Sequence, residues 1–256
     1  MRFSSRWLPF EIVAASLLVS FEARAQEDRT EVLRGTHRNV ESPQHFAAEL
    51  RFSPFLADVD SDPVLRGQTP FANIFGASKT IMFAGELDWQ AVRIPHLGTF
   101  GPGASVGYAM FNGNARITST NQVSGETTTL EIYPMYVVGV LRADALWKEL
   151  RLPLVPYLKF GVAAALWRAS NTVGTSYYEG TAGRGYSLGT QFALGLSFNL
   201  NILDDIAARS FDEDLGVNST YIIGEWSDAS LTGLGFQSDP LRVGGTYWTL
   251  GIAFEF

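Results

Sequence analysis

Histidine is the first candidate for acid–base chemistry in this 256-residue chain, and a carboxylate-only mechanism, for instance with Glu86 or Glu225, is the alternative. The three histidines are His37, His45 and His96, and each could serve as a general base beside a serine or an aspartate, as in hydrolases. The sequence holds no cysteine, which excludes thiol nucleophiles, disulfides and cysteine-ligated metal centres. Whether a histidine reaches a nucleophile depends on the elements that carry it.

A run of alternating aspartates is the second candidate. Asp58, Asp60 and Asp62 have the spacing of the first ligands in a calcium-binding loop. Such a loop then needs a glycine and a glutamate where this chain has Pro63 and Thr69. A solvated acidic loop is therefore the preferred interpretation, and we predict no metal and no cofactor.

The first 25 residues have the pattern of a cleaved export signal. Arg2 and Arg6 precede an apolar run over residues 12–21, and residues 23–25 follow the small-x-small rule for cleavage. The apolar run is shorter than the roughly 20 residues of a spanning helix, which disfavours the alternative of an uncleaved anchor. We expect a signal peptide over 1–25, a polar periplasmic leader over 26–44 and one domain over 45–256. The net charge of −7 argues against a nucleic-acid partner.

The element that must position any site is the β-strand, because hydrophobicity alternates with a period of two. Alternation is clearest at the C-terminus, where one face of a strand would carry Trp248, Leu250, Ile252, Phe254 and Phe256. Similar patterns predict seven more strands, over 46–53, 81–90, 103–112, 128–142, 158–166, 188–198 and 218–229. These lengths approach the roughly 9–11 residues with which a tilted strand crosses a bilayer.

The two faces differ in a way that favours a membrane barrel. One face is mostly Gly, Ala, Ser and Thr with isolated charges, which suits a narrow lumen. The other is apolar and would meet lipid, with interfacial aromatic residues expected at Trp89, Tyr136, Trp226, Trp248 and Phe256. The predicted fold is all-β, an antiparallel up-and-down transmembrane β-barrel of about eight strands. The alternative is a soluble secreted sandwich or barrel with the faces inverted.

The charged residues of the small-residue face define a predicted polar network in the lumen. Its expected members are Glu49, Arg51, Glu86, Asp88, Glu131, Lys159, Glu225 and Glu255. In strand 128–142 this choice turns Glu131 inward and sends Leu130 and Ile132 towards lipid. Unpaired ions in a narrow lumen are costly, so a plug of paired charges is preferred over a cation-selective pore. Glycines that could leave voids in the plug are Gly101, Gly103, Gly107, Gly139, Gly161, Gly189 and Gly195.

Turn-forming residues indicate the direction of the barrel. The connections rich in Gly, Ser, Thr, Asn and Asp are predicted to be outer loops, over 57–79, 114–127, 169–186 and 231–245. The periplasmic connections are 92–99, 143–153 and 201–217, with a short helix near 203–214. All three histidines then lie on the periplasmic side, too far from the outer rim to serve a hydrolase there.

Several segments support a resemblance to a known family. Residues 207–218, Glu225-Trp226, Pro70-Phe71, Phe75-Gly76 and Glu86 resemble a family of uncharacterised bacterial outer-membrane β-barrel proteins, over roughly 45–256. In size the chain is similar to the OmpA/OmpX-type eight-stranded barrels. The last strand looks like the C-terminal signal that the outer-membrane assembly machinery reads.

The resemblance implies a location and partners but no established activity. It places the chain in the bacterial outer membrane, among lipid and lipopolysaccharide, whose phosphates the acidic loop could bridge through divalent cations. We expect a non-enzymatic structural or surface-interaction protein that presents its outer loops. The alternative is a narrow pore for water or small ions, with the inward carboxylates setting preference.

Overall fold

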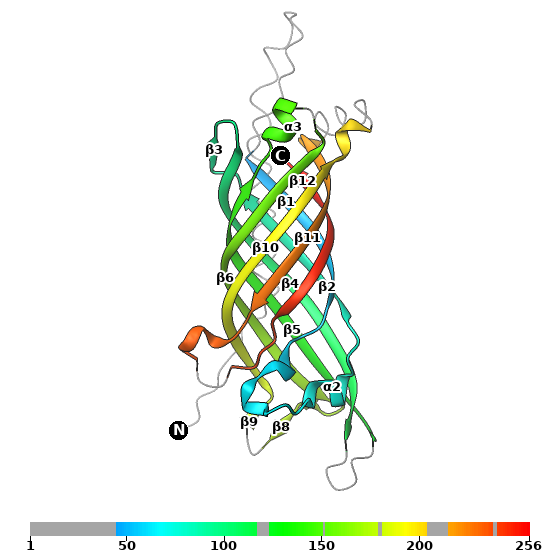
Figure 1. Ribbon diagram of the computed structural model, residues 1–256. Coiled ribbons are helices and arrows are strands. Elements are labelled where there is room, and N and C mark those ends of the chain that lie inside the picture. The colour runs from blue at the N-terminus through cyan, green and yellow to red at the C-terminus, as the bar shows by residue number, and fades with distance from the viewer. Residues whose placement is uncertain (1–44, 117–122, 151, 179–180, 204–214, 238–239) are drawn as a thin grey trace, which may run out of the picture. The chain divides into compact units, whose positions relative to one another are not determined.

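The computed structural model describes residues 45–116, 123–150, 152–178, 181–203, 215–237 and 240–256. Within them, eight long antiparallel strands close into a barrel (Figure 1). The strands are β1 (Phe46–Phe55), β2 (Thr80–Trp89), β4 (Gly98–Arg116), β5 (Val123–Arg142), β6 (Leu154–Asn171), β10 (Arg184–Asn199), β11 (Ser219–Ser230) and β12 (Gly245–Glu255). Each pairs with the next in this order, and β12 pairs with β1. The predicted fold class is confirmed.

Short elements occupy the connections at the two ends of the barrel. One end holds α2 (Pro70–Phe75), η1 (Val59–Ser61), η2 (Pro63–Leu65), η4 (Gly233–Gly235) and the small strands β7 (Gly174–Thr175), β8 (Tyr177–Tyr178) and β9 (Thr181–Ala182). The opposite end holds β3 (Val92–Ile94), α3 (Ala145–Leu150) and η3 (Leu200–Ile202) (Figure 1). The signal peptide and the leader lie outside the described residues, as do all residues but the first of the helix expected near 203–214. Among the described helices, none is both long and apolar enough to cross a membrane.

Along the strands, apolar side chains point outward and charged or small ones point inward, as a lipid-facing barrel requires. Along β1, Leu50 and Phe52 are 57% and 45% exposed on the outside, whereas Glu49 and Arg51 are buried. Trp248 on β12 is likewise exposed, and its neighbour Thr249 is buried. Inverted faces would bury the aromatic residues and expose the charges. The soluble alternative is therefore wrong.

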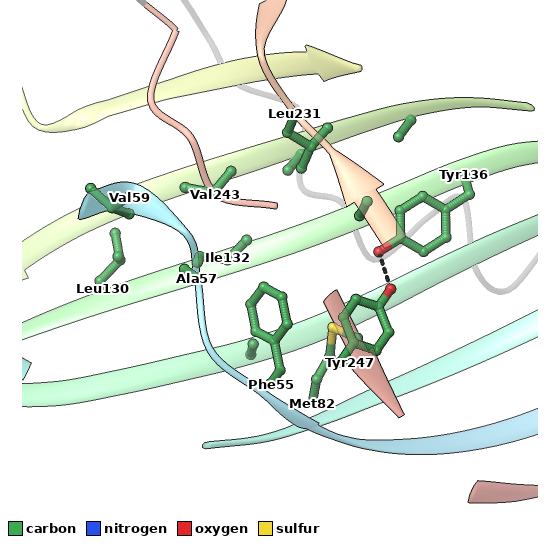
Figure 2. Packing of buried hydrophobic residues seen from close by; sticks show 14 of the residues in the cluster. Phe55, Ala57, Val59, Met82, Leu130, Ile132, Tyr136, Leu231, Val243 and Tyr247 are labelled. Carbon is green, nitrogen blue, oxygen red and sulfur yellow. Dashed lines mark hydrogen bonds between the residues drawn. The ribbon is translucent and has the colours of Figure 1, made fainter. Parts of the chain in front are cut away.

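The orientation predicted for the strand over 128–142 is wrong. In β5 the apolar residues Leu130, Ile132, Val138 and Val140 are buried inside the barrel. Tyr136, expected at the lipid interface, is also buried, and its hydroxyl lies 2.9 Å from that of Tyr247 (Figure 2). The reason is that the barrel interior near the outer connections is itself an apolar core. Hydrophobicity therefore does not distinguish the two faces of this strand.

This apolar cluster fills the half of the interior towards η1 and α2. Phe55, at the end of β1, contacts the Tyr247 ring edge-on at a centroid distance of 5.5 Å. The chain segments that follow β1 and β11 fold inward and add Ala57, Val59 and Leu231 to the cluster (Figure 2). The largest members are Phe55, Phe71, Met82, Phe111, Leu130, Ile132, Tyr136, Leu231 and Tyr247.

Four strands extend beyond the others at this end. β4, β5, β6 and β10 have 16 to 20 residues, compared with 10 to 12 in the remaining four. The predicted loops 114–127 and 169–186 are consequently too wide. Loop residues cover the edges that the extension exposes: Gln237 accepts a hydrogen bond from the Leu188 amide and donates one to the Tyr186 carbonyl of β10. Covered edges resist unwanted strand pairing.

Candidate functional site

A cluster of buried charges crosses the middle of the barrel. Arg51 on β1 donates hydrogen bonds from its two terminal nitrogens, one to Glu86 on β2 and one to Glu225 on β11. Its Nε lies 3.9 Å from Oε2 of Glu49. Because successive residues of a strand face opposite ways, the inward positions 49 and 51 place both charges in the interior. One guanidinium therefore joins three strands.

Lys159 reaches the same carboxylates from the opposite wall. Its Nζ lies 2.8 Å from Glu49, 2.5 Å from Glu86 and 3.6 Å from Glu225. β6, which carries Lys159, is four positions from β1 in the ring of eight strands. The contact with Glu49 consequently spans the full width of the interior.

Arg142, at the end of β5, completes the cluster. Its Nη2 lies 2.5 Å from both Glu49 and Asp88. The ring of Tyr157 receives both cations, with Lys159 Nζ at 4.9 Å and Arg142 Cζ at 5.5 Å from its centroid. The central ion-pair network comprises Glu49, Arg51, Glu86, Asp88, Arg142, Lys159 and Glu225, all at most 6% exposed.

The carboxylates of the network could in principle bind a cation, but cationic side chains of the protein already contact them. Oxygens of Glu49, Glu86 and Asp88 lie within 4.8 Å of one another, the one such group of three that the described residues form. Oxygen clusters of this kind can bind divalent cations. Here, nitrogens of Lys159 and Arg142 contact these carboxylates, so the acidic charge is met within the protein. The donor set does not fit a resident metal.

The sequence prediction missed one member of the network and misplaced another. Glu131 is half-buried on the outer face of β5, where it faces Arg168 across to β6 and lies 3.4 Å from the Tyr108 hydroxyl. Arg142 shares the inward parity of Val140, so the correct orientation of β5 would have predicted it. Both errors have the same cause, the apolar interior beside this strand.

The remaining predicted residue, Glu255, lies inside the barrel but apart from the network. It accepts hydrogen bonds at 2.9 Å from Gln90 and from the Tyr221 hydroxyl, near the end where β1 begins. The structure therefore brings together Glu49, Arg51, Glu86, Asp88, Lys159 and Glu225 of the predicted set.

The described histidines lie at the end of the barrel opposite to η1 and α2. His45 is exposed just before β1, and its amide donates to the Phe256 carbonyl at 3.0 Å. His96 is exposed in the turn before β4, with Nδ1 3.0 Å from Glu149. His37 lies outside the described residues. For His45 and His96, this placement agrees with the sequence argument against a histidine-dependent hydrolase at the outer rim.

The alternating aspartates stabilise the first outer connection. Asp60 accepts hydrogen bonds from the amides of Phe71 and Ala72 at 2.8 and 2.9 Å, at the start of α2. Asp62 accepts one from the Val64 amide at 3.0 Å, at the start of η2. Two of the three side chains thus satisfy backbone donors that the short helices leave open.

We expect Asp60→Ala to loosen this connection without unfolding the barrel. The substitution removes two charge-assisted hydrogen bonds, and the loss of a helix cap costs about 0.5–2 kcal/mol. Hydrogen exchange at the Phe71 and Ala72 amides should accelerate, whereas exchange in β1 and β2 should not change. Asp58→Ala is the matched control, because the Ser61 hydroxyl bonds to the carbonyl of Asp58 and not to its side chain. Equal effects of both substitutions would contradict the capping role.

Comparisons with known proteins concern the architecture. No protein-family model and no curated protein matches the chain. Solved structures with a similar course of the chain include Ail of Yersinia pestis, at 12% identity over 83% of this chain and 97% of that one, with a TM-score of 0.41. Neisserial surface protein A has 12% identity over 84% and 98%, with a TM-score of 0.41. OprG of Pseudomonas aeruginosa has 10% identity over 83% and 93%, with a TM-score of 0.40.

The location follows from the barrel's own anatomy. A closed ring of antiparallel strands satisfies every ladder hydrogen bond without an edge, which is what a strand needs in lipid. The outside is an apolar belt with aromatic residues, and the inside carries the ion pairs. The chain is an integral β-barrel protein of the bacterial outer membrane.

Proposed function

We propose that the barrel is a rigid, non-enzymatic scaffold that presents at the cell surface the outer connections between β1 and β2, β4 and β5, β6 and β10, and β11 and β12. The observation that carries the proposal is the central ion-pair network, which joins opposite walls. The apolar cluster lies between this network and the outer connections. An interior filled in two successive layers leaves the loops and the outer wall as the surfaces available for a role.

Exposed apolar side chains on these connections support a role in interaction. Val64, Val173, Tyr177 and Phe236 are 76%, 94%, 70% and 87% exposed. All four lie outside the long strands, beyond the lipid-facing belt. Apolar side chains that neither lipid nor the protein core covers are typical of surfaces that contact other macromolecules.

Two further partners belong to this proposal. The wall contacts outer-membrane lipid and lipopolysaccharide, and the C-terminal strand serves the assembly machinery through Trp248, Leu250, Ile252, Phe254 and Phe256. Trp248, Leu250 and Ile252 are exposed along the outer face of β12, where another protein could contact them before the barrel closes.

Planar-bilayer recordings test the filled interior. The folded barrel should insert and remain electrically silent at neutral pH under a salt gradient, because paired charges and packed aromatic residues occupy the lumen. A porin reconstituted in the same bilayer is the positive control. Discrete cation-preferring openings would contradict the proposal and favour the narrow pore.

Epitope insertion tests the presentation of the loops. A short epitope inserted after Val173 should bind antibody on intact cells, since this residue is 94% exposed in the β6–β10 connection. The same epitope after His96, in the turn at the opposite end, should bind only after permeabilisation. Labelling of intact cells at His96 would reverse the orientation on which the proposal rests.

A further inference from the structure

β4, β5 and β6 continue beyond the lipid-facing belt on the side of the outer connections (Figure 1). On the outside of β4 and β5, the rings of Tyr108 and Tyr133 have centroids 5.2 Å apart. Aromatic residues with a polar tip are typical of the edge of the lipid region. Thr127 lies six residues beyond Tyr133 on β5, which is roughly 20 Å along a strand at about 3.3 Å per residue. The outer face of these strand ends therefore lies outside the hydrocarbon layer.

The register aligns the outward side chains of these strand ends in rows. Asn112 on β4 is the cross-strand partner of Thr129 on β5, which in turn pairs with Ser170 on β6. One row further out, Asn114 pairs with Thr127. All five continue the outward parity of their strands, so their side chains share one face of the sheet. We call these five residues the neutral face.

The neutral face carries amides and hydroxyls. Asn112, Asn114 and Thr127 are exposed, and Thr129 and Ser170 are half-buried. A surface that meets only water usually includes lysine and glutamate, and neither stands at these five positions. Side-chain amides and hydroxyls can both donate and accept hydrogen bonds. Sugar hydroxyls have the same dual capacity, whereas an acyl chain has none of it.

The face is ordered before a ligand arrives. The Thr129 hydroxyl donates a hydrogen bond to Oδ1 of Asn112 at 2.9 Å, which orients the amide nitrogen of Asn112 as a donor. Ladder hydrogen bonds hold the backbone of the three strands, and the β-branched threonines have few rotamers. A face that is already ordered loses little conformational entropy when a ligand binds.

We propose that the neutral face binds the core oligosaccharide of a neighbouring lipopolysaccharide molecule. In the outer leaflet, the acyl chains of this lipid lie against the apolar belt, and its sugars begin where the belt ends. The neutral face continues the lipid-facing surface on the same strands, so both parts of one molecule meet matching chemistry. Sugar hydroxyls would accept hydrogen bonds from the amide nitrogens of Asn112 and Asn114 and exchange others with the hydroxyls of the face. The inference rests on the proposed contact of the wall with lipopolysaccharide and gives that contact a place.

Two forms of lipopolysaccharide test the assignment, one with a complete core and one truncated after its innermost sugars. Both carry the same lipid A, so the ratio of their affinities for the folded barrel reports the contact with the core. Competition in detergent, measured by intact-complex mass spectrometry, gives this ratio. The complete core should bind about tenfold more tightly, since two hydrogen bonds of ordinary net strength correspond to that factor. The preference should persist at high salt, because the contacts are between neutral groups.

Isosteric variants locate the contact on the barrel. Thr127→Val/Thr129→Val keeps the shape and the strand propensity but removes two hydroxyls, so the preference should fall to about threefold or less. Adding Asn112→Leu and Asn114→Leu should abolish it. The matched control is Thr128→Val, because Thr128 lies between the two threonines on β5 and points to the opposite side of the strand. This control should leave the ratio unchanged, and heat-modifiable gel migration verifies that each variant is folded.

Four results would overturn the inference. The first is equal affinity of the unaltered barrel for the two lipopolysaccharides, and the second is an equal effect of Thr128→Val and Thr127→Val/Thr129→Val. The third is a preference that disappears at high salt, which would assign the contact to core phosphates. The fourth is binding of the isolated core oligosaccharide as tight as that of the whole lipid, which would indicate a site for soluble glycans. A barrel that is silent in bilayers and displays its epitopes, but gives any of these results, would leave the proposed function intact.

Discussion

Replacing Arg51 by methionine is expected to lower the free energy of unfolding by about 3–5 kcal/mol. The guanidinium donates hydrogen bonds to both Glu86 and Glu225, and its side chain is 6% exposed. Its loss leaves four buried carboxylates of the network against two cations. Breaking a buried pair costs far more than the intact pair contributes, because the charge left behind has neither water nor a partner.

Urea titration of the barrel folded in lipid vesicles measures the effect. The control is Arg93→Met at the end of the barrel, where the 49% exposed side chain of Arg93 pairs with Asp144 at 2.8 Å. Half of the Arg93 side chain is in solvent, and Lys148 remains 3.1 Å from Asp144 when Arg93 is lost, so this pair should contribute only about 0–1 kcal/mol. Adding Glu225→Gln to Arg51→Met should recover part of the loss, since it removes one of the uncompensated charges. A loss no greater than that of Arg93→Met would show that water reaches the network.

The strands and most of their facing were predictable because the two faces of most strands differ in chemistry. Along β1, β2 and β12, large apolar side chains alternate with small or charged ones, and lipid selects the first set. This alternation was enough to place Glu49, Arg51, Glu86 and Lys159 in one interior. The alternation does not give the position of a residue along the barrel axis, so the sequence did not indicate which carboxylate contacts which cation.

β5 shows where such reasoning stops. Its inward residues Ile132 and Val138 are as apolar as the outward Val137, because they pack into the apolar cluster, whereas Val137 meets lipid. The lipid on the outer face of this strand and the apolar cluster on its inner face favour the same side chains. The partners that decide the orientation, Phe55 and Tyr247, come from strands more than 70 residues away in the sequence, and no local pattern reports them.

The inward glycines are a second limit of the sequence. They were expected to leave voids, but several are positions where another group already occupies the space of a side chain. A Cβ on Gly161 would lie 2.1 Å from the Val137 carbonyl oxygen, and one on Gly195 would lie 2.1 Å from the Tyr157 ring. A glycine in the sequence can therefore mark a position of close packing in the barrel and not a void.

Gly195→Val should consequently destabilise the barrel by about 3 kcal/mol, at the upper end of the usual cost of overpacking. The new Cβ would overlap with Cζ and the hydroxyl of Tyr157, a buried ring against which Lys159 and Arg142 lie. The ring must move, and the two cations then lose one of the faces that hold them among the carboxylates. The same urea titration in vesicles measures the loss.

The control and the rescue separate packing from strand propensity. Gly224→Val introduces the same side chain into a strand where a Cβ meets nothing within 4 Å, so stability should stay unchanged or rise slightly. Tyr157→Ala combined with Gly195→Val should cost less than the sum of the two single changes, because the cavity left by one accommodates the other. Additive losses would show that Gly195 is required for its backbone and not for the space that it leaves to Tyr157.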